Sequence, residues 1–252
     1  MRNLLFKIAF DGSAFHGWQQ QENAVTVQGE LKKAWERLTG EIPNIIGCSR
    51  TDAGVHANEY YFNVRTNSTI PAESFPVALS SAKLPKEISV YYCQEVDYEF
   101  NARFDCRKKE YEYIIENTQV SSPFMYKRAM HYKYKVDVEL LNKAAQCFVG
   151  THDFSAFCAA DAQVNSKVRT IYSASVIQDG SFIKFRVCGN GFLYNMVRIM
   201  AGTLLYVANG KIKVEDIPAI IESGDRTKAG VTAIPDGLYL NKVYYGGEVF
   251  EG

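Results

Sequence analysis

The sequence lacks any Cys-x-x-Cys pair, and its six cysteines are scattered along the 252 residues. The four histidines do not cluster with them, so no group of side chains has the spacing of zinc ligands. The start of the chain also lacks the pattern of a secretory leader, because Met1 runs straight into a strand-like pattern. Free, scattered thiols without such a leader are typical of the reducing cytosol, so we expect a cytoplasmic protein without a metal.

The sequence has little that would indicate a membrane protein or a nucleotide cofactor. Its one long apolar run, residues 192–208, is short for a bilayer and contains Arg198, which favours a buried helix. The glycines in the segment Asp11–Gln19 fit neither a Walker loop nor a dinucleotide fingerprint. We therefore expect no cofactor and no contact with a membrane.

Net charge is also absent, because 28 Lys and Arg residues balance 28 Asp and Glu residues. A neutral chain argues mildly against nucleic acid as a partner, since domains that bind RNA or DNA are often strongly basic. The charge is unevenly spread, however. Residues 103–135 hold eight basic side chains against four acidic ones, and residues 165–200 hold five against one. Such segregation can create a local positive groove, although chance would also produce it.

Alternating apolar residues and capping signals predict a mixture of strands and helices. Hairpin-like neighbours among the strands favour an α+β fold with a largely antiparallel sheet. The order strand, helix, strand is roughly duplicated, which predicts two similar halves, residues 1–104 and 105–252. We expect strands near residues 3–10, 42–47, 59–64, 88–96, 111–115, 129–136, 170–177, 182–187 and 239–244, and helices near 27–39, 71–82, 137–148, 192–208 and 214–223.

The octapeptide Arg50–Ala57 lies between two strand-like runs and contains an arginine, an aspartate and a glycine. A turn at Gly54 would hold Asp52 rigidly at the end of a sheet, where functional residues are often found. The same residues also suit an Asx-turn with a purely structural role. From these residues alone, both interpretations stay open.

Arg198 is the one charged side chain in the apolar run 192–208. At 100° per residue, small residues such as Ala201 and Gly202 share its face and would allow another backbone, or a ligand, to approach closely. A buried guanidinium requires a partner, and we expect Asp52 to be that partner. A structural ion pair, or an arginine that extends to water, would explain the residue equally well.

Tyr111 begins a strand directly after a basic stretch, with Tyr113 on the same face. Aromatic side chains beside basic ones on a strand suit stacking on an RNA base. The alternative is an ordinary core tyrosine, which is the more common role for any one of sixteen tyrosines.

Three motifs spread along the chain resemble those of the TruA family of tRNA pseudouridine synthases. They are Arg50–Ala57, Tyr111–Ile115 and Gly189–Arg198. The weaker matches are Asp11–Gln19, Phe100–Phe104, Gly150–Phe154, Arg169–Ile171 and Gly237–Leu240, so the resemblance extends over nearly the whole chain.

The sequence departs from the family pattern at a few positions. Ser49 stands where the family usually has glycine, and Val231 stands where it often has proline. The segment after Ala57 is also shorter than usual. These departures bear on which RNA position is served rather than on the reaction class.

The resemblance implies an isomerase that converts uridine to pseudouridine at positions 38–40 of the tRNA anticodon stem-loop, without a cofactor. It implies that Asp52 is the nucleophile, that Arg198 pairs with it and that Tyr111 packs on the target uracil. Arg50 is expected to help flip or hold the RNA, and Arg103 is a further candidate for binding it.

The resemblance also implies a fold of two ferredoxin-like halves that share one sheet, with helices packed on one side and an active-site cleft between the halves. It implies a homodimer whose tRNA spans both subunits.

Two alternatives are a non-catalytic RNA-binding protein of the same fold and a glycoside hydrolase. The hydrolase usually needs two acids around the scissile bond, and the matching motifs supply one.

Overall fold

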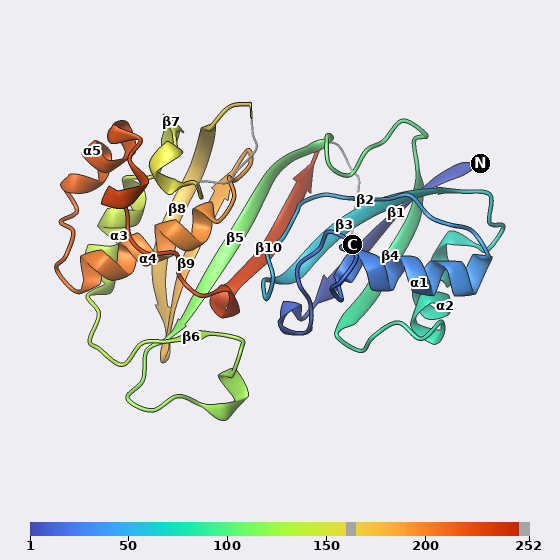
Figure 1. Ribbon diagram of the computed structural model, residues 1–252, viewed down its shortest axis with the longest axis horizontal. Helices are drawn as coiled ribbons and strands as arrows, with labels where there is room; N and C mark the ends of the chain where they lie inside the picture. The colour runs from blue at the N-terminus through green and yellow to red at the C-terminus, as the bar shows by residue number, and fades with distance from the viewer. Residues whose placement is uncertain (160–164, 247–252) are drawn as a thin grey trace. The chain divides into compact units, whose positions relative to one another are not determined.

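The computed structural model describes residues 1–159 and 165–246, and these fall into two compact units. Unit 1 contains residues 1–107 and the C-terminal residues from 240 onward, and unit 2 contains residues 108–239. The chain leaves unit 1 within strand β5 (Cys106–Glu116) and returns to it within strand β10 (Leu238–Tyr245). In Figure 1, β5 is green and β10 is red. The division predicted at residues 104 and 105 stays a prediction.

Unit 1 is built on a central strand, β1 (Arg2–Phe10), with antiparallel strands on both sides. Its neighbours are β3 (His56–Thr66) and β4 (Ile88–Val96), and the short strand β2 (Ile45–Gly47) pairs with β3. Its helices are α1 (Val27–Thr39) and α2 (Phe75–Ser81), and its 3-10 turns are η1 (Gly12–Ala14) and η2 (Ala72–Ser74).

The core of unit 1 is an aromatic cluster around Phe6, which is fully buried on β1. The Phe6 ring stacks on Phe62 at 4.7 Å between centroids and meets Trp35 of α1 and Phe75 of α2 edge-on. Trp35 and Phe75 also stack on each other at 5.1 Å. Both helices therefore cover the same face of the strands.

The ends of α1 follow the signals in the sequence. The Thr26 hydroxyl accepts a hydrogen bond from the Gly29 N–H at 3.3 Å, which caps the N-terminus. Gly40 ends the helix in the left-handed conformation at φ 74°, which glycine adopts without steric cost.

Unit 2 has antiparallel strands in the order β5, β9, β8, β7, with helices α3, α4 and α5. The strands are β7 (Gly150–Asp153), β8 (Val168–Asp179) and β9 (Phe182–Gly189), and the two-residue strand β6 (Met130–His131) pairs in parallel with β5. The helices are α3 (Val138–Gln146), α4 (Met196–Ala208) and α5 (Asp216–Ser223), with 3-10 turns η3 (Pro123–Met125), η4 (Ser155–Phe157), η5 (Arg226–Lys228) and η6 (Pro235–Gly237).

The α+β class with mostly antiparallel strands is confirmed, and three local expectations are corrected. The strand expected over 129–136 is only β6, because the backbone around it is held by side chains of the neighbouring turns. The helix expected from residue 192 begins at Met196, because Asn195 has φ 60°. The edge strand β7 was not expected. Among the described residues, no helix is long and apolar enough to cross a membrane.

The aromatic cluster predicts a strong dependence of unit 1 on Phe6. Phe6→Ala should lower the free energy of unfolding by about 3–5 kcal/mol, because it leaves a cavity among packed rings. Tyr91→Ala on β4, where the ring is exposed, should change it by only about 0.5 kcal/mol. Both tryptophans lie in unit 1, so urea denaturation followed by tryptophan fluorescence measures this unit. Equal losses in the two variants would contradict the prediction.

Candidate active site

Asp52 lies on the loop between β2 and β3, and its backbone closes a tight turn. The Val55 N–H donates to the Asp52 carbonyl at 3.2 Å, and Gly54 takes φ 79° inside the turn. The Cys48 N–H donates to the Tyr61 carbonyl at 2.9 Å, which fixes the start of the loop to β3. The Asp52 residue is half-buried and Arg50 is exposed.

The N-terminal loop, residues 11–19, is packed directly against the Asp52 loop. The Trp18 N–H donates to the Thr51 carbonyl at 3.1 Å, and the Gly54 N–H donates to the Phe15 carbonyl at 3.2 Å. A Cβ on Gly17, at φ 86°, would lie 2.5 Å from the Thr51 carbonyl oxygen. A Cβ on Gly12 would overlap the carbonyl of Val55. The two backbones can approach this closely only where there is no side chain.

Beneath the loop, Trp18 stacks on Tyr60 with 4.1 Å between ring centroids. The Tyr60 hydroxyl donates to the carbonyl of Ser49, and both rings are fully buried. Ser49 is not among the described non-glycine residues with positive φ. The backbone at this position therefore accepts a serine without strain, although the family usually has glycine here.

His56 is a buried member of the octapeptide, only 2% exposed, and its position was not foreseen. Its Nδ1 accepts from the Gly12 N–H at 3.1 Å and lies 3.2 Å from an Asp11 carboxylate oxygen. The contact joins the end of the Asp52 loop to the N-terminal loop. In the sequence, His56 is only a histidine at the start of a strand. That feature is too common to predict a contact with Gly12 and Asp11.

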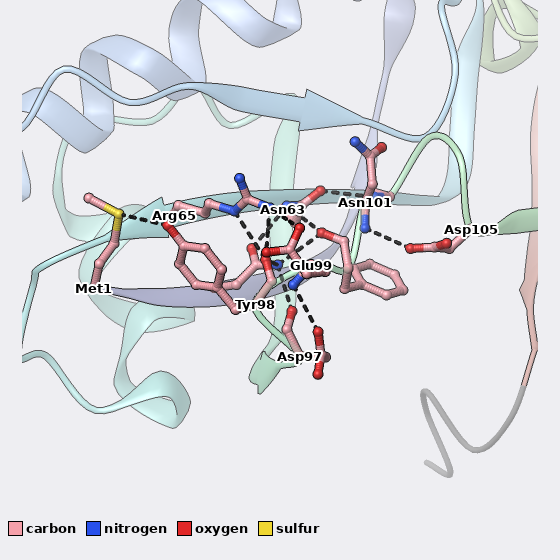
Figure 2. A network of polar contacts seen from close by, with 11 residues as sticks. Met1, Asn63, Arg65, Asp97, Tyr98, Glu99, Asn101 and Asp105 are labelled. Carbon is pink, nitrogen blue, oxygen red and sulfur yellow. Dashed lines mark hydrogen bonds and ion pairs between the residues drawn. The ribbon is translucent and has the colours of Figure 1, made fainter.

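Arg103 lies on the segment 97–105, which the buried side chains of Asn3 and Asn63 hold in place. Figure 2 shows this network, with Asn63 labelled. The Asn63 side chain donates to Asn3 Oδ1 at 2.9 Å and accepts from the Ala102 N–H at 2.9 Å. Asn3 in turn donates to the carbonyls of Asp97 and Phe100, both at 2.9 Å. Arg103 is exposed, beside the Phe104 ring. The network therefore fixes the backbone that carries the exposed guanidinium of Arg103.

Tyr111 lies on β5 in unit 2, opposite Val187 of β9, and is 6% exposed. Its ring meets Phe192 edge-on, with 5.0 Å between centroids and 81° between planes. Tyr113 is fully buried two residues further along, and its hydroxyl donates to the Ile234 carbonyl at 2.8 Å. Burial raises the pKa of Tyr113 above its ordinary value. Tyr113 is therefore a core residue, whereas Tyr111 contacts the turn that precedes α4.

Arg198 is half-buried in the first turn of α4, and two hydrogen bonds orient its guanidinium. Nε donates to the Ala233 carbonyl at 2.7 Å, and Nη1 donates to Asn195 Oδ1 at 2.8 Å. The Ala233 N–H donates back to the Arg198 carbonyl at 3.1 Å. The role of Asn195 was missed, because a left-handed asparagine before a helix leaves little trace in sequence.

The small residues beside Arg198 allow another backbone to approach, as expected. A Cβ on Gly202 would overlap the carbonyl of Val231. The Gly230 N–H donates to the Thr203 hydroxyl at 2.9 Å, which holds the same segment on the helix. Val231, where the family often has proline, thus contributes its backbone to this contact, and its side chain is exposed.

Each unit therefore brings together part of the predicted set of residues. Unit 1 holds the Asp52 loop, Arg50 and Arg103, and unit 2 holds Tyr111 and Arg198. The pairing of Asp52 with Arg198 joins residues of different units and stays a prediction. Within residues 1–159 and 165–246, no group of three or more His, Cys, Asp or Glu side chains could hold a metal ion.

Comparison with known proteins decides the family. A sequence model described as tRNA pseudouridine synthase matches residues 7–105 and 144–246. The chain belongs to the tRNA pseudouridine synthase family. It is therefore an enzyme, an isomerase, and neither a non-catalytic binding protein nor a glycoside hydrolase.

Relatives named tRNA pseudouridine synthase A resemble nearly the whole chain. The protein of Thermoanaerobacter sp. (strain X514) is 48% identical, and that of Acetivibrio thermocellus is 47% identical, each over 97% of this chain and 100% of the relative. Among solved structures, a chain of a Cbf5-Nop10-Gar1 complex gives a TM-score of 0.33 at 10% identity, over 96% of this chain and 59% of that chain, a likeness too weak to carry an argument.

The contact between the two loops predicts that Gly17→Ala lowers turnover about 100-fold, because its Cβ would displace the Thr51 and Asp52 backbone. Gly40→Ala is the matched control, since Gly40 also has positive φ but a Cβ there meets nothing within 4 Å. Both variants carry the same strain of roughly 1–2 kcal/mol. Pseudouridine formation and thermal unfolding should be measured together. Equal activity in the two variants would show that the loop contact does not position Asp52.

Proposed function

We propose that the protein converts uridine to pseudouridine in tRNA, at positions 38–40 of the anticodon stem-loop. The observation that carries the proposal is the rigid, half-buried placement of Asp52 in a chain 48% identical, over 97% of its length, to a protein named tRNA pseudouridine synthase A. The family membership supports the reaction class, and the resemblance of the motifs supports the position in tRNA.

The reaction breaks the bond between ribose C1′ and uracil N1, turns the uracil and forms a bond from C1′ to C5. The proton on C5 is lost and N1 gains one, so the product is an isomer of the substrate and no oxidant or reductant is needed. Asp52 is the proposed nucleophile, and it attacks either C1′ of the ribose or C6 of the uracil. We propose that neither a metal nor a nucleotide cofactor takes part.

Arg198 is the proposed partner of Asp52. The hydrogen bonds to Ala233 and Asn195 hold its guanidinium in one orientation, which suits a fixed charge beside a nucleophile. A neighbouring guanidinium lowers the pKa of a carboxylic acid and keeps it ionised. In this proposal Arg198 maintains the attacking form of Asp52.

Tyr111, Arg50 and Arg103 are proposed to hold the RNA. A target base must leave its stack at a cost of about a few kcal/mol, and an aromatic face can offset part of it. Tyr111 is proposed to provide that face to the uracil. Arg50 and Arg103 are exposed cations on anchored loops, and both suit contact with the phosphate backbone.

The larger assembly is proposed from the same resemblance. The protein is a cytoplasmic homodimer in this proposal, with one tRNA spanning both subunits. Its two ferredoxin-like halves, residues 1–104 and 105–252, bring Asp52 and Arg198 to one site.

The assignment predicts that Asp52→Asn lowers pseudouridine formation by at least about 10⁴-fold while stability and tRNA affinity stay close to wild type, because the amide cannot act as the nucleophile. Release of tritium from tRNA labelled at uracil C5 measures turnover, and mapping of the product gives the modified position. Glu36→Gln, at an exposed acid on α1 of the same unit, is the control and should keep full activity. Turnover retained in Asp52→Asn would reject the assignment.

A further inference from the structure

Residues 117–136 of unit 2, here called the β5–α3 lobe, carry basic charge without any acidic charge. The lobe contains four Lys or Arg residues and no Asp or Glu, although the whole chain is neutral. All four are exposed: Lys127, Arg128, Lys133 and Lys135. The lobe is therefore net positive, and an excess of acidic residues elsewhere in the chain makes the whole chain neutral.

The same lobe exposes large aromatic side chains beside these cations. Phe124 is 83% exposed and Tyr134 is 62% exposed. Lys133 Nζ lies 5.5 Å from the centre of the Tyr134 ring, and Lys127 Nζ lies 5.7 Å from that of Tyr126. Exposed apolar side chains that gather in one place mark interaction surfaces. Aromatic faces interleaved with cations are the combination that binds unstacked bases and their phosphates.

Hydrogen bonds hold the lobe in one conformation. The Asn117 side chain donates to the carbonyls of Tyr132 at 2.6 Å and Tyr134 at 2.8 Å. The buried carboxylate of Glu116 accepts from the Ser121 hydroxyl at 3.1 Å and the Ser122 N–H at 2.9 Å. The exposed rings thus lie on a fixed frame, which reduces the entropy that binding would cost.

The lobe also lies within reach of RNA held at Tyr111. It follows directly after β5, and Glu116 is five residues beyond Tyr111 on that strand. At ~3.3 Å per residue the separation along the strand is about 17 Å. An RNA strand that flanks a uridine packed on Tyr111 covers this distance with a few nucleotides, so its phosphates can reach the lobe.

From the charge, the exposed rings and the fixed frame, we propose that the β5–α3 lobe binds the RNA strand that flanks the target uridine, with its lysines on phosphates and its aromatic rings on bases. The inference rests on the proposed function and deepens it. RNA explains the surface better than a second copy of the chain, because a symmetric contact would place one cationic lobe against another.

The test is the triple variant Lys127→Gln, Lys133→Gln, Lys135→Gln. Its matched control replaces three exposed lysines elsewhere in unit 2, Lys211, Lys213 and Lys228, with glutamine. Binding of unmodified tRNA to the full-length protein is measured from low to high salt. Loss of three phosphate contacts should weaken binding by about tenfold or more and reduce the salt slope of log K by about 2–3, whereas the control should match wild type.

A second variant, Phe124→Ser with Tyr134→Ser, tests the rings. It should weaken binding by about tenfold for each base that loses a stacking partner, with little change in the salt slope. Both side chains are exposed, so both variants should fold.

Three further measurements keep this inference separate from the proposed function. Wild-type protein must form pseudouridine, since its failure to do so would reject the function and not the lobe. Single-turnover rates at saturating enzyme should be unchanged in both lobe variants, because the lobe binds RNA and does not react. Affinity and salt slope equal to the control, or a change of oligomeric state in sedimentation, would overturn the proposal, the latter because the surface would then be a contact between subunits.

Discussion

The position of Asp52 depends on a contact between two backbones that leaves no space for a side chain. Gly12 and Gly17 place the N-terminal loop directly against the Thr51–Val55 turn, and hydrogen bonds from Trp18 and Gly54 hold the two together. The Trp18–Tyr60 stack supports the loop from below. Unit 2 places Arg198 by the same means, since Gly202 lets the Val231 backbone lie against α4. In both units the absence of a Cβ lets a neighbouring backbone hold the segment that carries a proposed functional residue.

This construction matches what covalent catalysis requires of a protein. A nucleophile must be held close to one geometry by groups that are themselves anchored. Asp52 lies on a loop anchored at Cys48, Thr51 and Val55, and it remains half-buried rather than enclosed. The Arg198 guanidinium is oriented by Ala233 and Asn195. Each unit thus holds its own proposed catalytic residue in one orientation, and the proposed chemistry depends on that position and on the charge of Arg198.

Many of the strands and helices around the candidate site can be predicted from the sequence, and the contacts that cannot be predicted have identifiable physical reasons. The strands around the octapeptide, the cap at Thr26 and the buried helix around Arg198 follow from local patterns. The Asn3–Asn63 network could not be found in this way, because its members are 60 residues apart and an asparagine on a strand is ordinary. The expected start of α4 is four residues too early, because Asn195 lies inside the apolar run 192–208 and its left-handed backbone cannot be seen in the sequence. The strand expected over 129–136 is reduced to Met130–His131, because the Asn117 side chain holds the carbonyls of Tyr132 and Tyr134, and a contact of this kind leaves no periodic pattern in the sequence.

The most direct test of the account is a structure of the protein with unmodified tRNA bound. The measured quantities are the distances from the Asp52 carboxylate to the target uridine and to the Arg198 guanidinium. The account predicts that the carboxylate contacts the ribose or the uracil and lies within about 4 Å of the guanidinium, with the uracil against Tyr111. A target uridine held away from Asp52, or a carboxylate and a guanidinium on different surfaces, would contradict it.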